Sequence, residues 1–275
     1  MGCVYILLAT GLNLIFGVMK LVNFAHGQLL MIGAFITYTF ATYAGLNVYV
    51  SIVVSMLVVA GIGIIVERLT FRKVLGTDKL NEIFVSLGLI YIFENAAYLI
   101  WGDRSRQIVS PLTGLSLNLG RLSISYDRIT AMAIVVVTLV GLSLLIKKTK
   151  FGLAMRATSQ RSSTAMLMGI NINKVYLYTF AIGAALACAA GALSGIILPF
   201  DYLSGELPTI KAFAIIILGG LGSIPGAIIG GLLYGVAEQT ATLFFGGIWA
   251  DAVAFAVLII VLVIRPTGLF GEKGE

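Results

Sequence analysis

The chain of 275 residues is 59% hydrophobic and only 11% charged, and its mean hydropathy is +1.05. Soluble domains carry about a quarter charged residues, so this composition excludes a water-soluble protein. The net charge of +6 comes from basic residues in short stretches between apolar runs, which is typical of membrane topology and not of a nucleic-acid partner. We therefore expect an all-α polytopic membrane protein, in contact with membrane lipid, whose single transmembrane domain covers residues 1–275.

The apolar runs predict eight or nine transmembrane helices. A helix needs about 20 mostly apolar residues to cross the hydrocarbon core, where it satisfies its own backbone hydrogen bonds. If the short run over 209–222 only enters the membrane and returns, the number of crossings is eight instead of nine. The predicted spans are residues 3–19, 28–45, 48–66, 83–101, 129–146, 175–198, 209–222, 226–245 and 249–265.

The first two runs are joined by LVNFAHG, residues 21–27, which contains the only histidine. His26 is either a proton relay or gate, because histidine titrates near neutral pH, or an interfacial residue hydrogen-bonded to local backbone. Asn23 is expected to cap the helix that follows. No positively charged segment precedes the first run, so we expect that run to stay in the membrane and not to be cleaved as a signal peptide.

Two carboxylates, Glu94 and Glu238, fall well inside predicted spans, where a charge is costly and needs a partner. One hypothesis is that they couple protons to transport. The other is structural: each binds a neighbouring amide, such as Asn95 or Gln239, or pairs with Lys211.

The loops predict the orientation of the chain, because Lys and Arg resist translocation. The loops after the third and fifth runs are the most basic, so both are expected in the cytoplasm together with Arg265 and Lys273. The loop over 102–128 and the N-terminus are then outside, and the alternating LSLNLGRLSISY over 115–126 predicts a small hairpin there. The basic residues of the two cytoplasmic loops are Arg68, Arg72, Lys73 and Lys79, and Lys147, Lys148, Lys150, Arg156, Arg161 and Lys174.

Residues 151–170, within the cytoplasmic loop 147–174, predict one amphipathic helix that Gly169 ends. Such a helix is either a lever that docks on a separate ATPase or an ordinary helix at the membrane interface, and periodicity does not choose between them. Its apolar side comprises Ala154, Ala157, Ala165, Met166, Leu167 and Met168, and its polar side comprises Arg156, Gln160 and Arg161.

Small residues mark two further segments. Gly183, Ala187, Gly191 and Gly195 recur every four residues and predict a close helix contact, within the subunit or across a dimer axis. The stretch GGLGSIPGAIIGG over 219–231 predicts either a pore-lining break or, as we favour, a tight reversal between two helices. Packing roles are expected for Gly230, Gly231 and Gly235.

No chemical site is predicted. The sequence lacks a GxxxxGK[ST] loop, so any ATP that drives this protein is hydrolysed by another chain. Cys3 and Cys188 lie in apolar runs without metal-ligand spacing, which predicts no metal, no cofactor and no disulfide. We expect a protein that is not an enzyme.

Three segments resemble the permeases of high-affinity branched-chain amino acid importers. They are GLNLIFGVMKLVNFAHGQLLMIGAF over 11–35, GLAMRATSQRSSTAMLMGININKVYLYTFAIGAALACAAGAL over 152–193, and KAFAIIILGGLGSIPGAIIGGLLYGVAE over 211–238. The resemblance extends to RPTGLFG near the C-terminus. LVNFAHG and the pattern around Arg156 and Gly169 are more similar to the first of the family's two permease types.

The resemblance implies a set of partners in the bacterial inner membrane. These are a second permease subunit, two cytoplasmic ATP-binding subunits and a periplasmic substrate-binding protein, with branched-chain or other amino acids as substrates, and urea or short amides as the alternative. It also implies that loop 147–174 is the ATPase-coupling loop. The expected coupling residues are Gly152, Arg156, Ala157, Gln160, Ala165 and Gly169.

Overall fold

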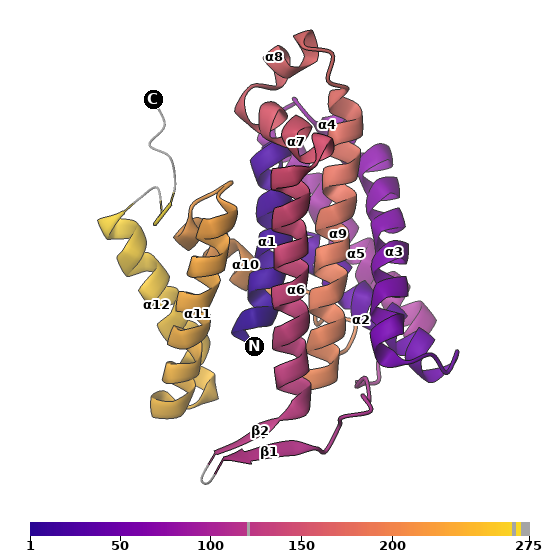
Figure 1. The fold of residues 1–275 in the computed structure, drawn as a ribbon, viewed down its shortest axis with the longest axis vertical. Coiled ribbons are helices and arrows are strands. Elements are labelled where there is room, and N and C mark those ends of the chain that lie inside the picture. Colours follow the sequence, from indigo (N-terminus) through magenta and orange to yellow (C-terminus); the bar gives the residue numbers. More distant parts are fainter. Residues whose placement is uncertain (120–121, 266–267, 271–275) are drawn as a thin grey trace.

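The computed structural model describes residues 1–119, 122–265 and 268–270, and it is almost entirely helical (Figure 1). Gly120 and Arg121 of the predicted hairpin and Lys273 near the C-terminus lie outside the described residues. Six of the described helices are long and apolar enough to cross a membrane, which confirms an all-α polytopic membrane fold. They are α1 (Gly2–Met19), the continuous helix Val48–Val74, α5 (Lys79–Trp101), α6 (Tyr126–Lys148), α9 (Ile172–Ile197) and α11 (Ile224–Phe245).

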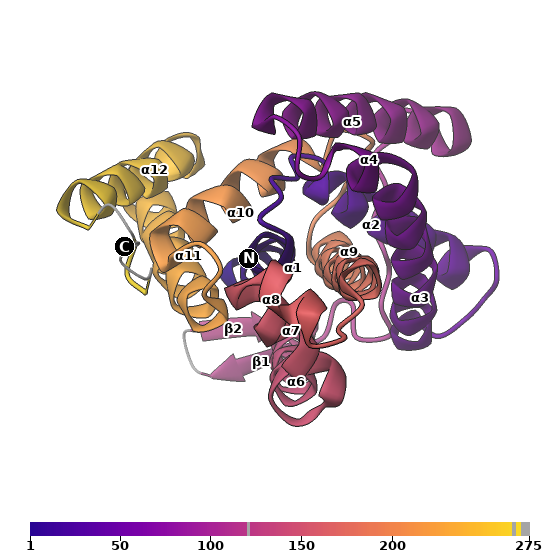
Figure 2. The same ribbon diagram turned by 90° about the horizontal axis from the view of Figure 1, so that it is seen from above.

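Helices α1 and α9 form the centre of the bundle. Within the apolar windows of these two helices 78% of residues are buried, against 22% for α5 and 17% for α6, so the latter two lie at the periphery. Seen from above, α1 and α9 are surrounded by α5, α3 (Val48–Val66) and α6, with α11 and α12 (Gly247–Ile264) to one side (Figure 2).

The predicted small-residue stripe lies on α9 and packs within the subunit. A Cβ added at Gly191 would overlap the carbonyl oxygen of Leu30, and one at Gly183 would lie 2.7 Å from the side chain of Ile15. Ala187 is fully buried, and Gly195 faces the ring of Phe200. Small side chains thus bring α9 close to α1 and α2 (His26–Thr42), where no water-driven force holds helices together.

Two helices are shorter than a full span. Helix α2 has 17 residues and α10 (Glu206–Gly219) has 14, against the predicted runs over 28–45 and 209–222. Their N-termini meet inside the bundle, where the Gly27 N–H donates to Thr209 Oγ1 at 3.1 Å. A Cβ at Gly27 would overlap the Gly205 carbonyl, so only glycine permits this approach.

The basic stretch after the third run is helical, and its prediction as a loop is wrong. Helix α3 continues through a π-helical turn, η1 (Glu67–Phe71), into α4 (Arg72–Val74). Arg72 donates to both carboxylate oxygens of Glu67, at 3.1 and 2.7 Å, so charge pairing within the turn lets the helix extend past the apolar run.

The predicted hairpin is confirmed. Strands β1 (Ser116–Leu119) and β2 (Leu122–Ser125) pair antiparallel, with Ser116 opposite Ser125. The hairpin lies at one end of the bundle, whereas α4, α7 (Lys150–Gln160) and α8 (Ser162–Leu167) lie at the other (Figure 1). The two most basic segments therefore lie at the same end of the bundle, as predicted when both were placed in the cytoplasm.

The segment 151–170 is not one helix, which corrects the prediction. Arg161 has an extended backbone, with φ −151° and ψ 103°, and separates α7 from α8. The run of Ser162, Ser163 and Thr164 that follows has side chains that compete for backbone hydrogen bonds, which weakens helix continuity. Gly169, at φ 83°, ends the segment as predicted.

The glycine-rich stretch over 219–231 contains a tight reversal between α10 and α11, which confirms the interpretation that the sequence favoured. Gly220 and Gly222 have φ of 104° and 86°, and α11 begins directly afterwards with Pro225 in its first turn. The predicted packing roles are also confirmed. Gly230, Gly231 and Gly235 lie against Ile215, Ile6 and Gly2, respectively.

Candidate functional site

Helix α7 is fixed to the bundle by its inner face. A Cβ at Gly152 would overlap the Ile146 carbonyl, so this glycine allows the chain to reverse sharply after α6. Thr149 caps α7 by accepting from the Gly152 N–H at 2.9 Å. Met155 and Thr158 are buried, whereas Arg156 and Gln160 are exposed and Ala157 is half-buried. Two of the predicted coupling residues thus lie on the outer surface, and Gly152 shapes the turn.

Helix α8 carries the apolar surface of this segment. Met166, Leu167 and Met168 are 62%, 87% and 80% exposed, whereas Ala165 is only 4% exposed. Ala165 is therefore buried within the subunit, and its coupling role stays a prediction. We call Met166, Leu167 and Met168 the apolar knob.

A pocket of about 100 Å³ lies beneath α7. Its lining includes Arg156 and Ser159 of α7, Asn13 of α1, and Gly222 in the turn between α10 and α11. Asn13 holds that turn, because its amide donates to the Ser223 carbonyl at 2.7 Å and its oxygen accepts from the Gly222 N–H at 2.6 Å. We did not single out Asn13 from the sequence, although a buried amide within an apolar run is a detectable feature.

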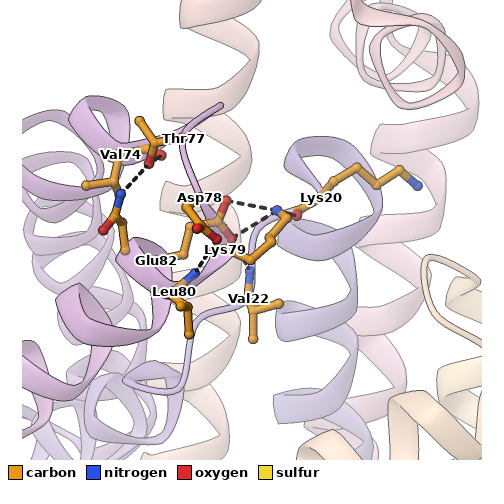
Figure 3. Close-up of polar contacts among 9 residues, drawn as sticks. Lys20, Val22, Val74, Thr77, Asp78, Lys79, Leu80 and Glu82 are labelled. Atoms are coloured by element: carbon orange, nitrogen blue, oxygen red, sulfur yellow. Dashed lines mark hydrogen bonds and ion pairs between the residues drawn. The ribbon is translucent and has the colours of Figure 1, made fainter.

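The first turn of α5 clamps the chain where it leaves α1 (Figure 3). Lys79 Nζ donates to the Lys20 carbonyl at 2.7 Å and pairs with Glu82 at 2.8 Å. Glu82, 1% exposed, also accepts from the Val22 N–H at 3.3 Å. Glu82 was not predicted from the sequence, although its i,i+3 spacing from Lys79 indicates an ion pair.

The LVNFAHG link enters the bundle beyond this clamp. Asn23 Oδ1 accepts from the Ala25 N–H at 3.0 Å, but Ala25 is the N-cap of α2, so the expected capping role of Asn23 is wrong. His26 is fully buried, and neither ring nitrogen has a hydrogen-bond partner among the described residues. The interfacial, hydrogen-bonded placement expected for His26 is therefore also wrong.

Glu94 of α5 is bound by an amide from a distant helix. It is 6% exposed, and its Oε1 accepts from Gln28 Nε2 of α2 at 2.8 Å. The suggested partner Asn95 instead donates to the Tyr91 carbonyl. Glu94, Asn95, Tyr98 and Tyr202 line an open pocket of about 300 Å³.

Glu238 of α11 pairs with Lys211 of α10, as one of the two hypotheses held. Lys211 is 7% exposed and also pairs with Asp251 of α12 at 2.7 Å. This ion cluster joins three helices. Asp251 was missed because its partner lies 40 positions away in the sequence, beyond the reach of local spacing rules.

The chain is similar to known transport permeases over nearly its whole length. A family model described as "Branched-chain amino acid transport system / permease component" matches residues 1–262. The branched-chain amino acid permease protein BraD of Pseudomonas aeruginosa is 36% identical over 98% of this chain and 92% of its own length. LivH of Escherichia coli is 32% identical over 99% and 92%, and the probable LivM permease of Methanocaldococcus jannaschii is 24% identical over 98% and 91%. No significant match was found among solved structures.

Proposed function

This chain belongs to the family of branched-chain amino acid transport permeases, and we propose that it is the first-type permease subunit of an ATP-driven amino acid importer in a bacterial inner membrane. The proposal includes a single permease domain over residues 1–275. ATP is hydrolysed by two cytoplasmic subunits and not by this chain, and the permease itself needs no cofactor. A second permease subunit and a periplasmic substrate-binding protein complete the complex, since the relatives bear the names of components of transport systems.

The observation that carries this proposal is the apolar knob on α8. Its three large apolar side chains are exposed. Helix α8 itself lies at the end of the molecule opposite the hairpin (Figure 1). Exposed apolar groups of this kind mark a docking surface. Here the apolar knob fits into a groove on the ATPase subunit. The exposed Arg156 and Gln160 form the polar rim of the same contact.

Under this proposal the end that carries α7 and α8 is cytoplasmic, and loop 102–128 with its hairpin is external. The chain then crosses the membrane nine times. Helices α2 and α10 complete their crossings with the non-helical segments that precede them, which accounts for their short lengths. Broken helices at this depth are tolerated where other protein surrounds them.

The pocket beneath α7 suggests how motion of the motor reaches the membrane. If the ATPase moves α8, then α7 moves with it, because only Arg161 separates them. Arg156 and Asn13 line the same pocket, and Asn13 holds the turn between α10 and α11. Movement of α7 is therefore expected to tilt α10 and α11 against α1.

A second candidate function, a proton-coupled transporter using Glu94, Glu238 and His26, is less well supported. Glu238 is neutralised by Lys211, which favours a structural role for this carboxylate. The two functions differ in a simple test: only the importer requires ATPase subunits, and a proton-coupled transporter would take up solute with no such partner present.

The coupling proposal is tested by Leu167→Asp in the full complex. Leu167 is 87% exposed, so the substitution leaves the permease folded but places a charge in the ATPase groove. We expect the ATPase subunits to be lost on purification in mild detergent and ATP-dependent leucine uptake to fall about tenfold or more. Leu115→Asp is the matched control, because Leu115 is 52% exposed at the opposite, hairpin end. Normal copurification with Leu167→Asp would refute the docking assignment.

A further inference from the structure

Helix α5 carries a polar stripe where its exposed surface meets the bundle. Tyr91, Glu94, Asn95 and Tyr98 follow the spacing i, i+3, i+4 and i+7, so they share one edge of the helix. Tyr91 and Tyr98 are 66% and 47% exposed. The adjoining edge is apolar and also exposed, with Ile92 at 62% and Leu99 at 81%. The apolar edge and the polar edge of α5 therefore lie side by side around the helix axis.

This stripe lies at membrane depth. Helix α5 runs from Lys79 to Trp101, so at 1.5 Å per residue Glu94 lies about 22 Å from one end and about 10 Å from the other. The apolar edge suits lipid at this depth. The polar edge does not, because a carboxylate facing hydrocarbon is strongly unfavourable.

Glu94 has no cationic partner among the described residues, where the ion pairs join Arg72, Lys79 and Lys211 to other acids. Gln28 satisfies its Oε1, but its Oε2 has no recorded hydrogen bond to the part of the chain that the structure describes. Glu94 is only 6% exposed, and it lines the pocket of about 300 Å³. Glu206, in the first turn of α10, lies within electrostatic range and adds a second negative charge.

Tyrosine rings border the same pocket. Tyr98 of α5 and Tyr202, just before α10, meet edge to face with ring centroids 5.4 Å apart. Carboxylates and aromatic faces together are the groups that recognise an ammonium ion in a partly dry site. Two nearby carboxylates attract a cation more strongly than a neutral donor, and they repel an anion.

We propose that the pocket formed by Glu94, Asn95, Tyr98 and Tyr202 is a transit site on a water-filled path, and that Glu94 binds the α-ammonium group of an amino acid there. This inference rests on the proposed function and names the part of the substrate that the permease itself contacts. The path runs along the polar edge of α5, and the apolar edge faces lipid or a dry protein contact. Binding is weak enough for release, because the site contacts one group of the substrate and leaves the side chain free.

The water-filled path is tested by cysteine labelling of the assembled complex in membrane vesicles. Asn95→Cys and Ile92→Cys are compared in a Cys3→Ala background, with Cys188 retained because it is fully buried. The probe is a charged, hydrophilic thiol reagent, which reacts with thiolate in water but not with a thiol in lipid. We expect Asn95→Cys to react at least about tenfold faster than Ile92→Cys. An unreactive Asn95→Cys, or equal reaction at both positions, would overturn the proposal.

The ammonium contact is tested by Glu94→Gln, which keeps an oxygen for Gln28 but removes the charge. In vesicles with the complete complex and its binding protein, radiolabelled leucine uptake is expected to fall about tenfold, since a charge-assisted bond becomes a neutral one. ATP hydrolysis stimulated by the loaded binding protein is expected to persist.

The outcomes of this second test separate the two proposals. If the unsubstituted complex takes up no amino acid, the proposed function is wrong. If it is active and Glu94→Gln is equally active, the transit site is wrong and the proposed function stands. If Glu94→Gln fails to assemble, Glu94 has a structural role that overturns the ammonium contact, and the cysteine pair still decides whether the polar edge faces water.

Discussion

Replacing Lys211 with methionine tests how the ion cluster on α10 holds the outer helices. Lys211 is 7% exposed and pairs with Glu238 and Asp251, so the substitution leaves two carboxylates facing each other without a cation. Removing one member of a buried ion pair costs about 3–5 kcal/mol. Because the Asp251 side chain is 40% exposed and partly hydrated, we expect a smaller loss, of roughly 2–4 kcal/mol.

The assay is the thermal unfolding of the detergent-purified complex. A loss of that size corresponds to a fall of roughly 5–10 °C in the melting temperature. The control is the triple variant Lys211→Met, Glu238→Gln, Asp251→Asn, which removes the unpaired charges along with the cation and is expected to recover most of the loss. A single variant that melts within about 1 °C of the unsubstituted protein would show that the cluster does not bind α10 to α11 and α12.

Three further predictions follow from the packing of the bundle. Gly191→Ala forces a Cβ onto the Leu30 carbonyl and should destabilise the protein by about 1–3 kcal/mol in thermal unfolding, whereas Gly141→Ala, with open space around it, should not. Asn13→Leu leaves the Gly222 N–H and the Ser223 carbonyl without their partner, and should lower leucine uptake per ATP hydrolysed while the ATPase subunits still copurify; unchanged coupling would contradict a role of this turn in transmission. Glu82→Gln weakens the clamp on Lys20 and should speed proteolysis at the link between α1 and α2, as measured by limited digestion in vesicles, and an unchanged digestion pattern would contradict the clamp.

The membrane helices could be predicted because hydropathy is a local property. The span over 48–66 coincides with α3, and the hairpin over 115–126 contains both strands. The length by which a helix extends past its apolar run could not be predicted in this way, because it does not depend on hydropathy alone. The π-helical turn that extends α3 depends on the ion pair between Glu67 and Arg72, and composition alone assigned those residues to a loop.

The partners of the embedded polar groups could not be predicted. Gln28 and Glu94 are 66 positions apart, and Asn13 is 210 positions from Ser223. Contacts of this kind depend on which helices become neighbours, and spacing rules report only residues three or four apart. The pairing of Glu238 is the exception. It was foreseeable because Lys211 is the one basic residue in the last three predicted spans before Arg265.

The break at Arg161 changes how the coupling segment must work. A single helix over 151–170 would present its apolar residues along one side, so that the same face would have to contact both the ATPase and the bundle. Two helices separate these tasks: α7 buries Met155 and Thr158 against the bundle, and α8 exposes the apolar knob. The joint is one extended residue, whose N–H donates to the Ala157 carbonyl at 3.2 Å and whose carbonyl accepts from the Ala165 N–H at 3.0 Å, so displacement of α8 is passed on to α7. The proposed motor should therefore push α7 toward the Asn13 turn, and lengthening the joint by glycine insertion after Arg161 should reduce uptake per ATP without loss of the ATPase subunits.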